Sequence, residues 1–171
     1  MNKKLKGFTL MELIIVLAII GILTAIFIPS WMNWIAMSKV RKQNNNARII
    51  FNAAQTVAQD YKFRERKLED GEKIVGNGEF YFYWDRNNGV ATKDGNSVDG
   101  SEFARQLNRM YGDAPETAYR IYVKNYMVQS VVAASGNTNR NKGSYPTKQD
   151  GRNTTDVQSF DMSSIVLSPT T

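Results

Sequence analysis

Residues Leu13–Ile28 form an apolar run interrupted only by Thr24, and one carboxylate, Glu12, stands directly before it. About 20 consecutive apolar residues cross the hydrocarbon core of a bilayer as one helix, and the stretch Phe8–Ile28 has that length. A carboxylate in a spanning helix costs roughly 2.5–3.5 kcal/mol at the bilayer centre and less near the end. Glu12 is therefore a candidate functional residue that needs a partner.

The composition argues against most kinds of catalysis. The chain has no cysteine and no histidine, which removes thiol chemistry, disulfides and the commonest metal ligand and general base. It also lacks the G-x-S-x-G, S-x-x-K and phosphate-loop motifs. The net charge is +6, but the basic residues are scattered among acidic ones and form no run. We therefore predict no nucleic-acid binding by the monomer. We predict no enzymatic activity, no cofactor and no metal site.

Two general interpretations of residues 1–37 compete with a more specific one. A cleavable secretory signal fits the basic start, but the apolar run is too long, and Trp31 and Trp34 intrude before the small-residue site at Ala36 and Ser38. A plain signal anchor would place the two tryptophans at the far membrane interface. It explains the hydrophobicity but gives Glu12 no role.

The segment KGFTLMEL, residues 6–13, resembles the cleavage and methylation signal of type IV prepilins and of their relatives, the type II secretion pseudopilins. The resemblance implies that a membrane peptidase cuts after Gly7 and that the new N-terminal residue, Phe8, is N-methylated. Glu12 then occupies the fifth position of the mature chain, where the family has a glutamate. Gly21 and Pro29 also fall where the family tends to place a glycine and a proline. The likeness is close over residues 3–30 and general beyond them.

The resemblance supplies a partner for Glu12. Cleavage frees a cationic amine at Phe8, and Glu12 of one subunit can meet the Phe8 amine of its neighbour in a filament. Opposite charges inside a hydrophobic bundle attract far more strongly than in water. The alternative is that Glu12 lies at the level of the lipid headgroups and has no role.

The resemblance also implies a location and partners. The chain would cross the cytoplasmic (inner) membrane once, with its N-terminus in the cytoplasm, and would then enter a filament at the cell surface. Charge does not decide the orientation, because the lysines before the apolar run are matched by basic residues after it. The implied partners are other pilins in a homo- or hetero-oligomeric filament, the prepilin peptidase/methyltransferase, the membrane and an assembly platform protein.

One helix is predicted from about Phe8 to about Lys67, bent or loosened between Gly21 and Pro29. Its second half carries one apolar stripe at helical spacing, with polar residues on the other side. The stripe comprises Val40, Ala47, Phe51, Ala54, Ala58 and Tyr61. The predicted organisation is a leader (1–7), a transmembrane and filament-core helix (8–37), an amphipathic half packed on the head (38–67) and a β-rich head (68–171).

Within the head, alternating residues predict a strand over 79–85, with Phe80, Phe82 and Trp84 on one face. A turn-rich segment (85–100) is predicted next, followed by a helix that starts at a Ser101 cap and has Phe103, Leu107 and Met110 on one face. Two strands (118–123 and 126–135) are predicted to be joined over Lys124 and Asn125. A long polar loop (136–155) and a last strand (157–168) complete the prediction. The predicted fold class is α+β and type IV pilin-like: a small antiparallel sheet packed on the long helix.

Two further candidate ligand sites in the head are better explained as a turn and as packing between strands. Asp94 and Asn96 have calcium-loop spacing, but Val98 breaks the pattern, so a plain turn is favoured. Tyr81 and Tyr83 form either an exposed stacking platform or, preferably, cross-strand packing pairs.

The polar loop is predicted to be solvated or to contact a neighbouring subunit. Its charged residues are Arg140, Lys142, Lys148, Arg152 and Asp150. Because the chain has no cysteine, either packing holds this loop or the loop stays mobile.

The sequence thus predicts a structural pilin of a type IV pilus or pilus-like filament. A type II secretion pseudopilin or minor pilin is the alternative within this class. A monomeric membrane-anchored extracellular binding domain is the alternative from another class.

Overall fold

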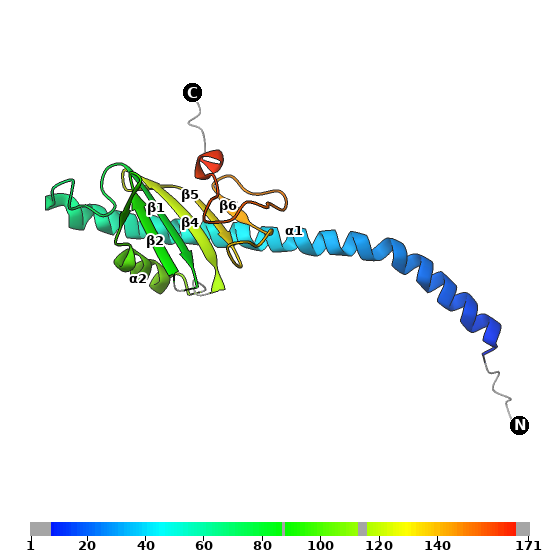
Figure 1. Cartoon of the computed structure of the whole chain (residues 1–171). Coiled ribbons are helices and arrows are strands. Elements are labelled where there is room, and N and C mark those ends of the chain that lie inside the picture. Colours follow the sequence, from blue (N-terminus) through cyan, green and yellow to red (C-terminus); the bar gives the residue numbers. More distant parts are fainter. Residues whose placement is uncertain (1–7, 87, 113–115, 167–171) are drawn as a thin grey trace, which may run out of the picture. The chain divides into compact units, whose positions relative to one another are not determined.

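The computed structural model describes residues 8–86, 88–112 and 116–166. Helix α1 (Leu10–Arg64) is followed by a short 3-10 helix, η1 (Glu65–Lys67), so the single long predicted helix is confirmed (Figure 1). The helix continues through Gly21 and Pro29, and the loosening expected there stays a prediction. The chain divides between Ala36 and Met37 into two compact units.

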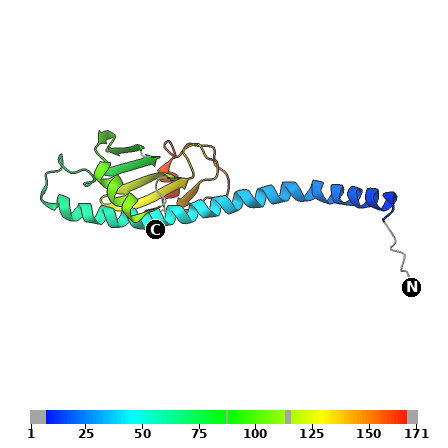
Figure 2. The same ribbon diagram turned by 90° about the horizontal axis from the view of Figure 1, so that it is seen from below.

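The head contains one six-stranded antiparallel sheet in the order β3-β2-β1-β4-β5-β6. Its strands are β1 (Glu79–Asp85), β2 (Asn88–Lys93), β3 (Asn96–Val98), β4 (Ala118–Lys124), β5 (Met127–Ala134) and β6 (Gly143–Tyr145). The second half of α1 runs along one side of this sheet (Figure 2). The predicted α+β architecture, with a small antiparallel sheet on the long helix, is confirmed.

The main core lies between the sheet and the two helices α1 and α2 (Ser101–Met110). Strand β1 alternates as predicted: Phe80, Phe82 and Trp84 are buried here, because successive side chains of a strand point to opposite faces. Of the predicted apolar stripe of α1, Ala54 is fully buried against the same core and Phe51 partly buried. Ile50 and Val57, which the predicted stripe did not include, are also fully buried there. Fully burying such larger aliphatic side chains contributes about 1.5–3 kcal/mol each.

The opposite face of the sheet packs against the segment 157–165. Val157, Phe160, Met162 and Ile165 pack against residues of β4 and β5. The prediction of a last strand here was wrong: the segment forms a 3-10 helix, η3 (Met162–Ile165). The reason is local, because the side chain of Asp161 accepts a hydrogen bond from the backbone N–H of Ser163 at 3.0 Å and caps a helical turn.

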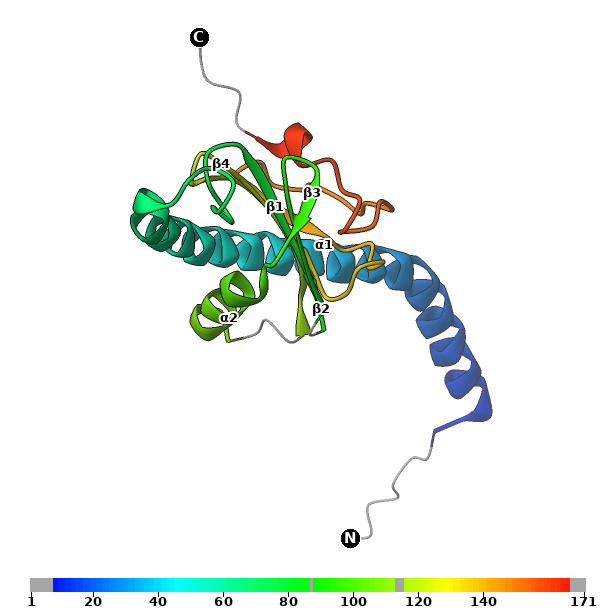
Figure 3. The same cartoon turned by 60° about the vertical axis from the view of Figure 1, so that its left-hand side comes forward.

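The prediction of a turn-rich segment over 85–100 was also wrong, since most of it forms β2 and β3 at one edge of the sheet (Figure 3). These strands are polar and mostly exposed, so they lack the apolar alternation that would have predicted them. Asp94 and Gly95 join them with φ of +47° and +85°. Positive φ at both central residues is what a two-residue type I′ hairpin turn requires.

Two further boundaries differ from prediction. Ser101 is the first residue of α2 rather than its cap; its backbone N–H donates to Asp99 Oδ1 at 2.9 Å. Met110 is 54% exposed and lies outside the core. The predicted β4–β5 hairpin is confirmed, but it turns at Asn125 and Tyr126, which both have positive φ.

Candidate functional site

The first turn of α1 is closed by a reciprocal pair of side chains. Glu12 Oε2 accepts hydrogen bonds from the backbone N–H of Thr9 at 2.8 Å and from its hydroxyl at 2.9 Å. The backbone N–H of Glu12 donates to Thr9 Oγ1 at 3.3 Å. This is a capping box, a threonine followed three residues later by a glutamate, and it satisfies N–H groups that have no partner within the helix. Thr9 is not among the residues predicted from the sequence, although its T-x-x-E spacing to Glu12 is typical of a capping box.

The capping box leaves acceptor capacity on Glu12. A carboxylate offers about four acceptor positions, and the hydrogen bonds found among the described residues use Oε2 only. Phe8 precedes the box and is 91% exposed. Gly7 lies outside the described residues. The structure therefore brings Phe8, Thr9 and Glu12 together at one helix start, with Glu12 Oε1 still able to accept from another molecule.

The helix that follows exposes its apolar side chains on all sides. Every large apolar side chain between Phe8 and Ile35 is exposed, as at Ile20 (53%) and Phe27 (66%). Of the described helices, α1 alone is long and apolar enough to cross a membrane. Exposed apolar surface on this scale marks a membrane or protein contact.

Gly21 and Pro29 lie in the interior of this apolar segment. A Cβ built on Gly21 would meet no atom within 4 Å, so nothing in the chain's own described packing requires a glycine there. Thr24 Oγ1 donates to the carbonyl of Ile20 at 2.7 Å, which satisfies its hydroxyl within the helix. The function of Gly21 and Pro29 stays a prediction.

In the head, polar residues of α1 are buried, contrary to the expectation that they cover its outer side. Asn44 Oδ1 accepts from the backbone N–H groups of Ser144 at 2.8 Å and Gln149 at 3.1 Å, and its Nδ2 donates to the Gln149 carbonyl at 2.9 Å. Gln43 Nε2 donates to Ser135 Oγ at 2.9 Å. The partners of Gln43 and Asn44 lie about 90–105 residues later in the sequence, so no local pattern could show that these two side chains are buried.

The polar loop over 136–155 is likewise more ordered than predicted, and it contains β6. Lys142 is fully buried, and its Nζ donates to the carbonyls of Asn139 at 2.5 Å and Asn153 at 3.1 Å. Burial lowers the pKa of this ammonium group. Gly143 packs so closely on α1 that a Cβ there would overlap the backbone of Gln43 and Asn44. The expectation of a solvated loop holds for the exposed residues Arg140, Lys148 and Arg152 but is wrong for Lys142.

The tyrosines of β1 are engaged within the sheet. Tyr81 stacks on Tyr122 of β4 with ring centroids 4.6 Å apart, and the Arg120 guanidinium lies 5.2 Å from the centroid of Tyr81. The Tyr83 hydroxyl donates to Asp85 Oδ2 at 3.5 Å. The preferred interpretation, cross-strand packing, is therefore confirmed for Tyr81.

Asp94 uses its carboxylate in the hairpin, where Oδ1 accepts from the backbone N–H of Glu79 at 2.8 Å. Among the described residues, no cluster of three or more His, Cys, Asp or Glu side chains could hold a metal ion.

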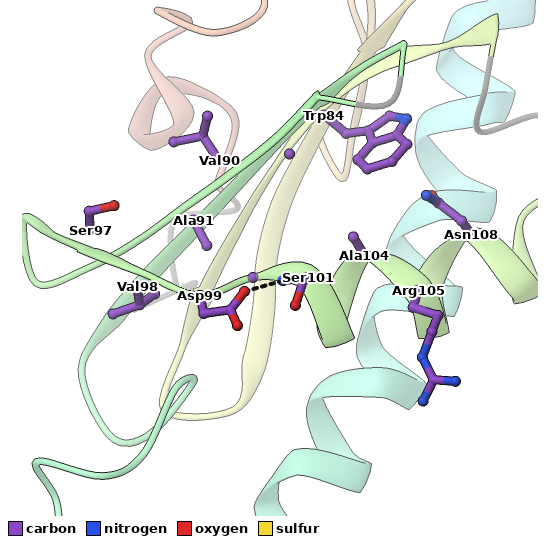
Figure 4. Close-up of a pocket in the computed structure, with 12 residues that line it drawn as sticks. Trp84, Val90, Ala91, Ser97, Val98, Asp99, Ser101, Ala104, Arg105 and Asn108 are labelled. Carbon is purple, nitrogen blue, oxygen red and sulfur yellow. Dashed lines mark hydrogen bonds between the residues drawn. The ribbon is translucent and has the colours of Figure 1, made fainter.

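A cavity of about 520 Å³ lies between the β2–β3 hairpin and α2 (Figure 4). Trp84, Ala91, Asp99, Ala104 and Arg105 are among the residues that line it. The Asp99 carboxylate is already used by the Ser101 N–H. Hydrogen bonding from the backbone and the hydroxyl of Ser101 lowers the pKa of the Asp99 carboxyl, as expected where a side chain satisfies the start of a helix.

Comparisons with known proteins identify the N-terminal segment. Residues 2–28 match the family model described as the prokaryotic N-terminal methylation motif. The chain is 45% identical over 71 residues to the type IV major fimbrial protein FimA of Dichelobacter nodosus, which is 42% of each protein. It is 44% identical over 55 residues to the type IV major pilin protein PilA of Myxococcus xanthus, covering 32% of this chain and 25% of PilA.

A probable minor fimbrial protein of Dichelobacter nodosus is 38% identical over 76 residues, covering 44% of this chain and 42% of the relative. The chain thus spans less than half the length of these relatives. No solved structure matches it significantly. The chain thus carries the prokaryotic N-terminal methylation motif, and its N-terminal part is similar to that of type IV pilins and fimbrial proteins.

Proposed function

We propose that this chain is a structural subunit of a type IV pilus or pilus-like filament, cleaved after Gly7 and assembled through α1. The observation that carries the proposal is the methylation motif running directly into a helix whose large apolar side chains are all exposed up to Ile35. A monomer outside the membrane would expose this apolar surface to water, which is unfavourable. Neighbouring copies of the same helix would bury it in a filament.

The processing steps follow from the motif. Hydrolysis of the Gly7–Phe8 bond leaves a carboxylate on Gly7 and an amine on Phe8, and a methyl group then replaces one hydrogen of that amine. Before processing, the chain would cross the cytoplasmic membrane once with its N-terminus inside. A prepilin peptidase/methyltransferase and an assembly platform protein are the proposed partners.

Glu12 would then have two roles at different stages. Within one chain it closes the capping box with Thr9. In the filament its carboxylate would also accept from the Phe8 amine of a neighbouring subunit, where the low dielectric strengthens the attraction. Because a lone carboxylate in hydrocarbon is costly, assembly would relieve that cost by supplying the cation.

Two variants separate these roles. Glu12→Gln keeps the capping box, since glutamine also serves at this position, but removes the charge; we expect it to insert in the membrane and fail to form filaments. Thr9→Ala keeps the charge and loses the cap at a cost of about 1 kcal/mol, so it should still assemble. Normal filament yield from Glu12→Gln would reduce Glu12 to a helix cap and exclude the ion pair.

Cleavage and assembly are tested by the intact mass and N-terminal sequence of protein sheared from the cell surface. We expect a chain that begins at Phe8 and carries one added methyl group. A chain that retains residues 1–7 and occurs only in the membrane fraction would contradict the proposed function. The similarity to a probable minor fimbrial protein favours a minor pilin as the alternative. The abundance of the chain in sheared filaments would distinguish a minor from a major subunit.

A further inference from the structure

A small basic cavity lies in the head beside the segment of α1 that follows Ala36. It measures about 350 Å³ and is lined by Lys39, Lys42, Gln43, Ser135, Asn139 and Asn141. This volume is near the lower end of the range for ligand pockets, about 300–1,000 Å³. The lining contains two cations and four neutral polar side chains and no carboxylate, so its chemistry suits an anion.

The two lysines are available to a ligand. Lys39 and Lys42 are three residues apart on α1 and therefore lie on the same side of the helix. Both are exposed, and neither forms an ion pair or hydrogen bond within the described part of the chain. A lysine ammonium is a compact, flexible point charge that binds phosphate groups well.

A second feature points to an occupant that also carries a hydrogen-bond donor. Asn141 Oδ1 is buried and finds no hydrogen-bond partner among the described residues. A buried polar atom without a partner costs about 1–3 kcal/mol. The terminal torsion of an asparagine side chain is soft, so the carboxamide can turn toward a hydroxyl group in the cavity. A ligand with an anionic group for the two lysines and a hydroxyl group for Asn141 fits this cavity, and a phosphodiester of a polyol has both groups.

The position of the cavity in the chain indicates where such a phosphodiester would come from. Lys39 follows Trp34 by five residues, a distance of at most about 18 Å even for a fully extended chain. Tryptophans at the end of an apolar span favour the membrane interface, so the tether keeps the cavity within reach of lipid headgroups. We propose that this cavity binds the headgroup phosphate of an anionic lipid that carries a free hydroxyl, such as a phosphatidylglycerol, and rests the head on the membrane before assembly.

This inference rests on the membrane-anchored stage of the proposed function, but its test does not require a filament. The full chain is placed in zwitterionic detergent micelles, and the amide resonances of Ser135, Asn139 and Asn141 are followed by NMR. The micelles receive phosphatidylglycerol or phosphatidylcholine at the same mole fraction, or the buffer receives inorganic phosphate. We expect saturable shifts with phosphatidylglycerol at a lower concentration than with either other probe.

The matched variants remove equal charge at different places. The double variant Lys39→Gln/Lys42→Gln should weaken the phosphatidylglycerol response about thirtyfold, because each lysine near an anionic surface contributes roughly a fivefold factor. The control Lys62→Gln/Lys67→Gln removes two exposed lysines that do not line the cavity, and it should bind within twofold of the unchanged chain.

Several results would overturn the proposal. Equal responses to phosphatidylglycerol and phosphatidylcholine would remove the requirement for anion and hydroxyl, and equal affinity for inorganic phosphate would make the cavity a small-ion site. Equal loss in both double variants would indicate nonspecific charge attraction. If lipid causes no shift and Lys39→Glu/Lys42→Glu blocks filament formation, the cavity would belong to a contact with an acidic side chain of another subunit. Normal filaments without lipid binding would refute this inference alone.

Discussion

Residues 10–36 and 37–64 belong to one helix but differ in what surrounds their side chains. In the first part, large apolar side chains up to Ile35 are exposed, and Glu12 caps the helix start. In the second part, an apolar stripe is buried except at the partly buried Phe51, and Asn44 has three hydrogen bonds to residues about 100 positions later. Most helical stability in proteins comes from packing an amphipathic face. The second part therefore gains its stability from this chain, whereas the first must gain it from lipid or from other subunits.

The largest expected effect uses two isoleucines on the same helix. Ile50 is fully buried and Ile20 is 53% exposed. Ile50→Ala should lower the free energy of unfolding of the head by about 3–4 kcal/mol, through lost burial and a residual cavity. Ile20→Ala should change it by less than about 0.5 kcal/mol. Urea titration of the full chain in detergent, followed by near-ultraviolet circular dichroism, measures both. Equal losses would show that the two parts of α1 do not differ as described.

A smaller effect comes from neighbouring asparagines. Asn44→Ala removes the partner of the buried Ser144 N–H and of the partly buried N–H and carbonyl of Gln149, and should cost about 2 kcal/mol. Asn45 is exposed, with no hydrogen bond from its side chain in the described structure, so Asn45→Ala should be nearly neutral. Hydrogen exchange at Ser144 and Gln149 should accelerate in the first variant only. Unchanged protection there would mean that the loop is held without Asn44.

The smallest expected effect concerns Tyr61, whose hydroxyl is buried and lacks a hydrogen-bond partner among the described residues. Burial, with help from Glu102 and Glu65, raises the pKa of Tyr61 to about 12. Because the native pKa lies above the unfolded-state pKa of about 10, the ionisation of Tyr61 does not affect stability below pH 10 and lowers stability as the pH rises from 10 to 12. At pH 11 the expected loss from this residue alone is on the order of 1 kcal/mol.

The substitution Tyr61→Phe tests both statements. It should raise stability at pH 7 by about 1 kcal/mol, because it removes an unsatisfied buried hydroxyl, and it should weaken the decline between pH 10 and 12. Denaturant titrations of both chains at pH 7 and pH 11 provide the comparison. A variant that is less stable at pH 7 would show that the hydroxyl has a partner in solution.

Prediction from sequence succeeded where the signal is local. The long helix follows from an apolar run and a stripe at helical spacing, and β1 follows from strict alternation at Phe80, Phe82 and Trp84. It failed for β2 and β3, because exposed edge strands show no apolar period. It also failed for η3, where a single carboxylate, Asp161, caps a turn.

The candidate site divides in the same way. Gly7, Phe8 and Glu12 were predicted from a contiguous motif, and their roles in processing and assembly stay a prediction; Thr9 could have been added from its spacing to Glu12. The capping box was therefore within reach of the sequence, whereas the pairing of Glu12 with another subunit concerns a second molecule and stays a proposal.

The sequence by itself determined the length of the helix, its apolar start and the motif before it, because each depends on neighbours within a few residues. Only the tertiary structure decided that Asn44 and Lys142 are buried and that Gly143 must lie against the backbone of α1. An asparagine or lysine is equally suited to water, and its burial becomes favourable only when distant carbonyl and N–H groups arrive to satisfy it. The packing of the sheet on the helix brings those partners together, and no local sequence pattern predicts that packing.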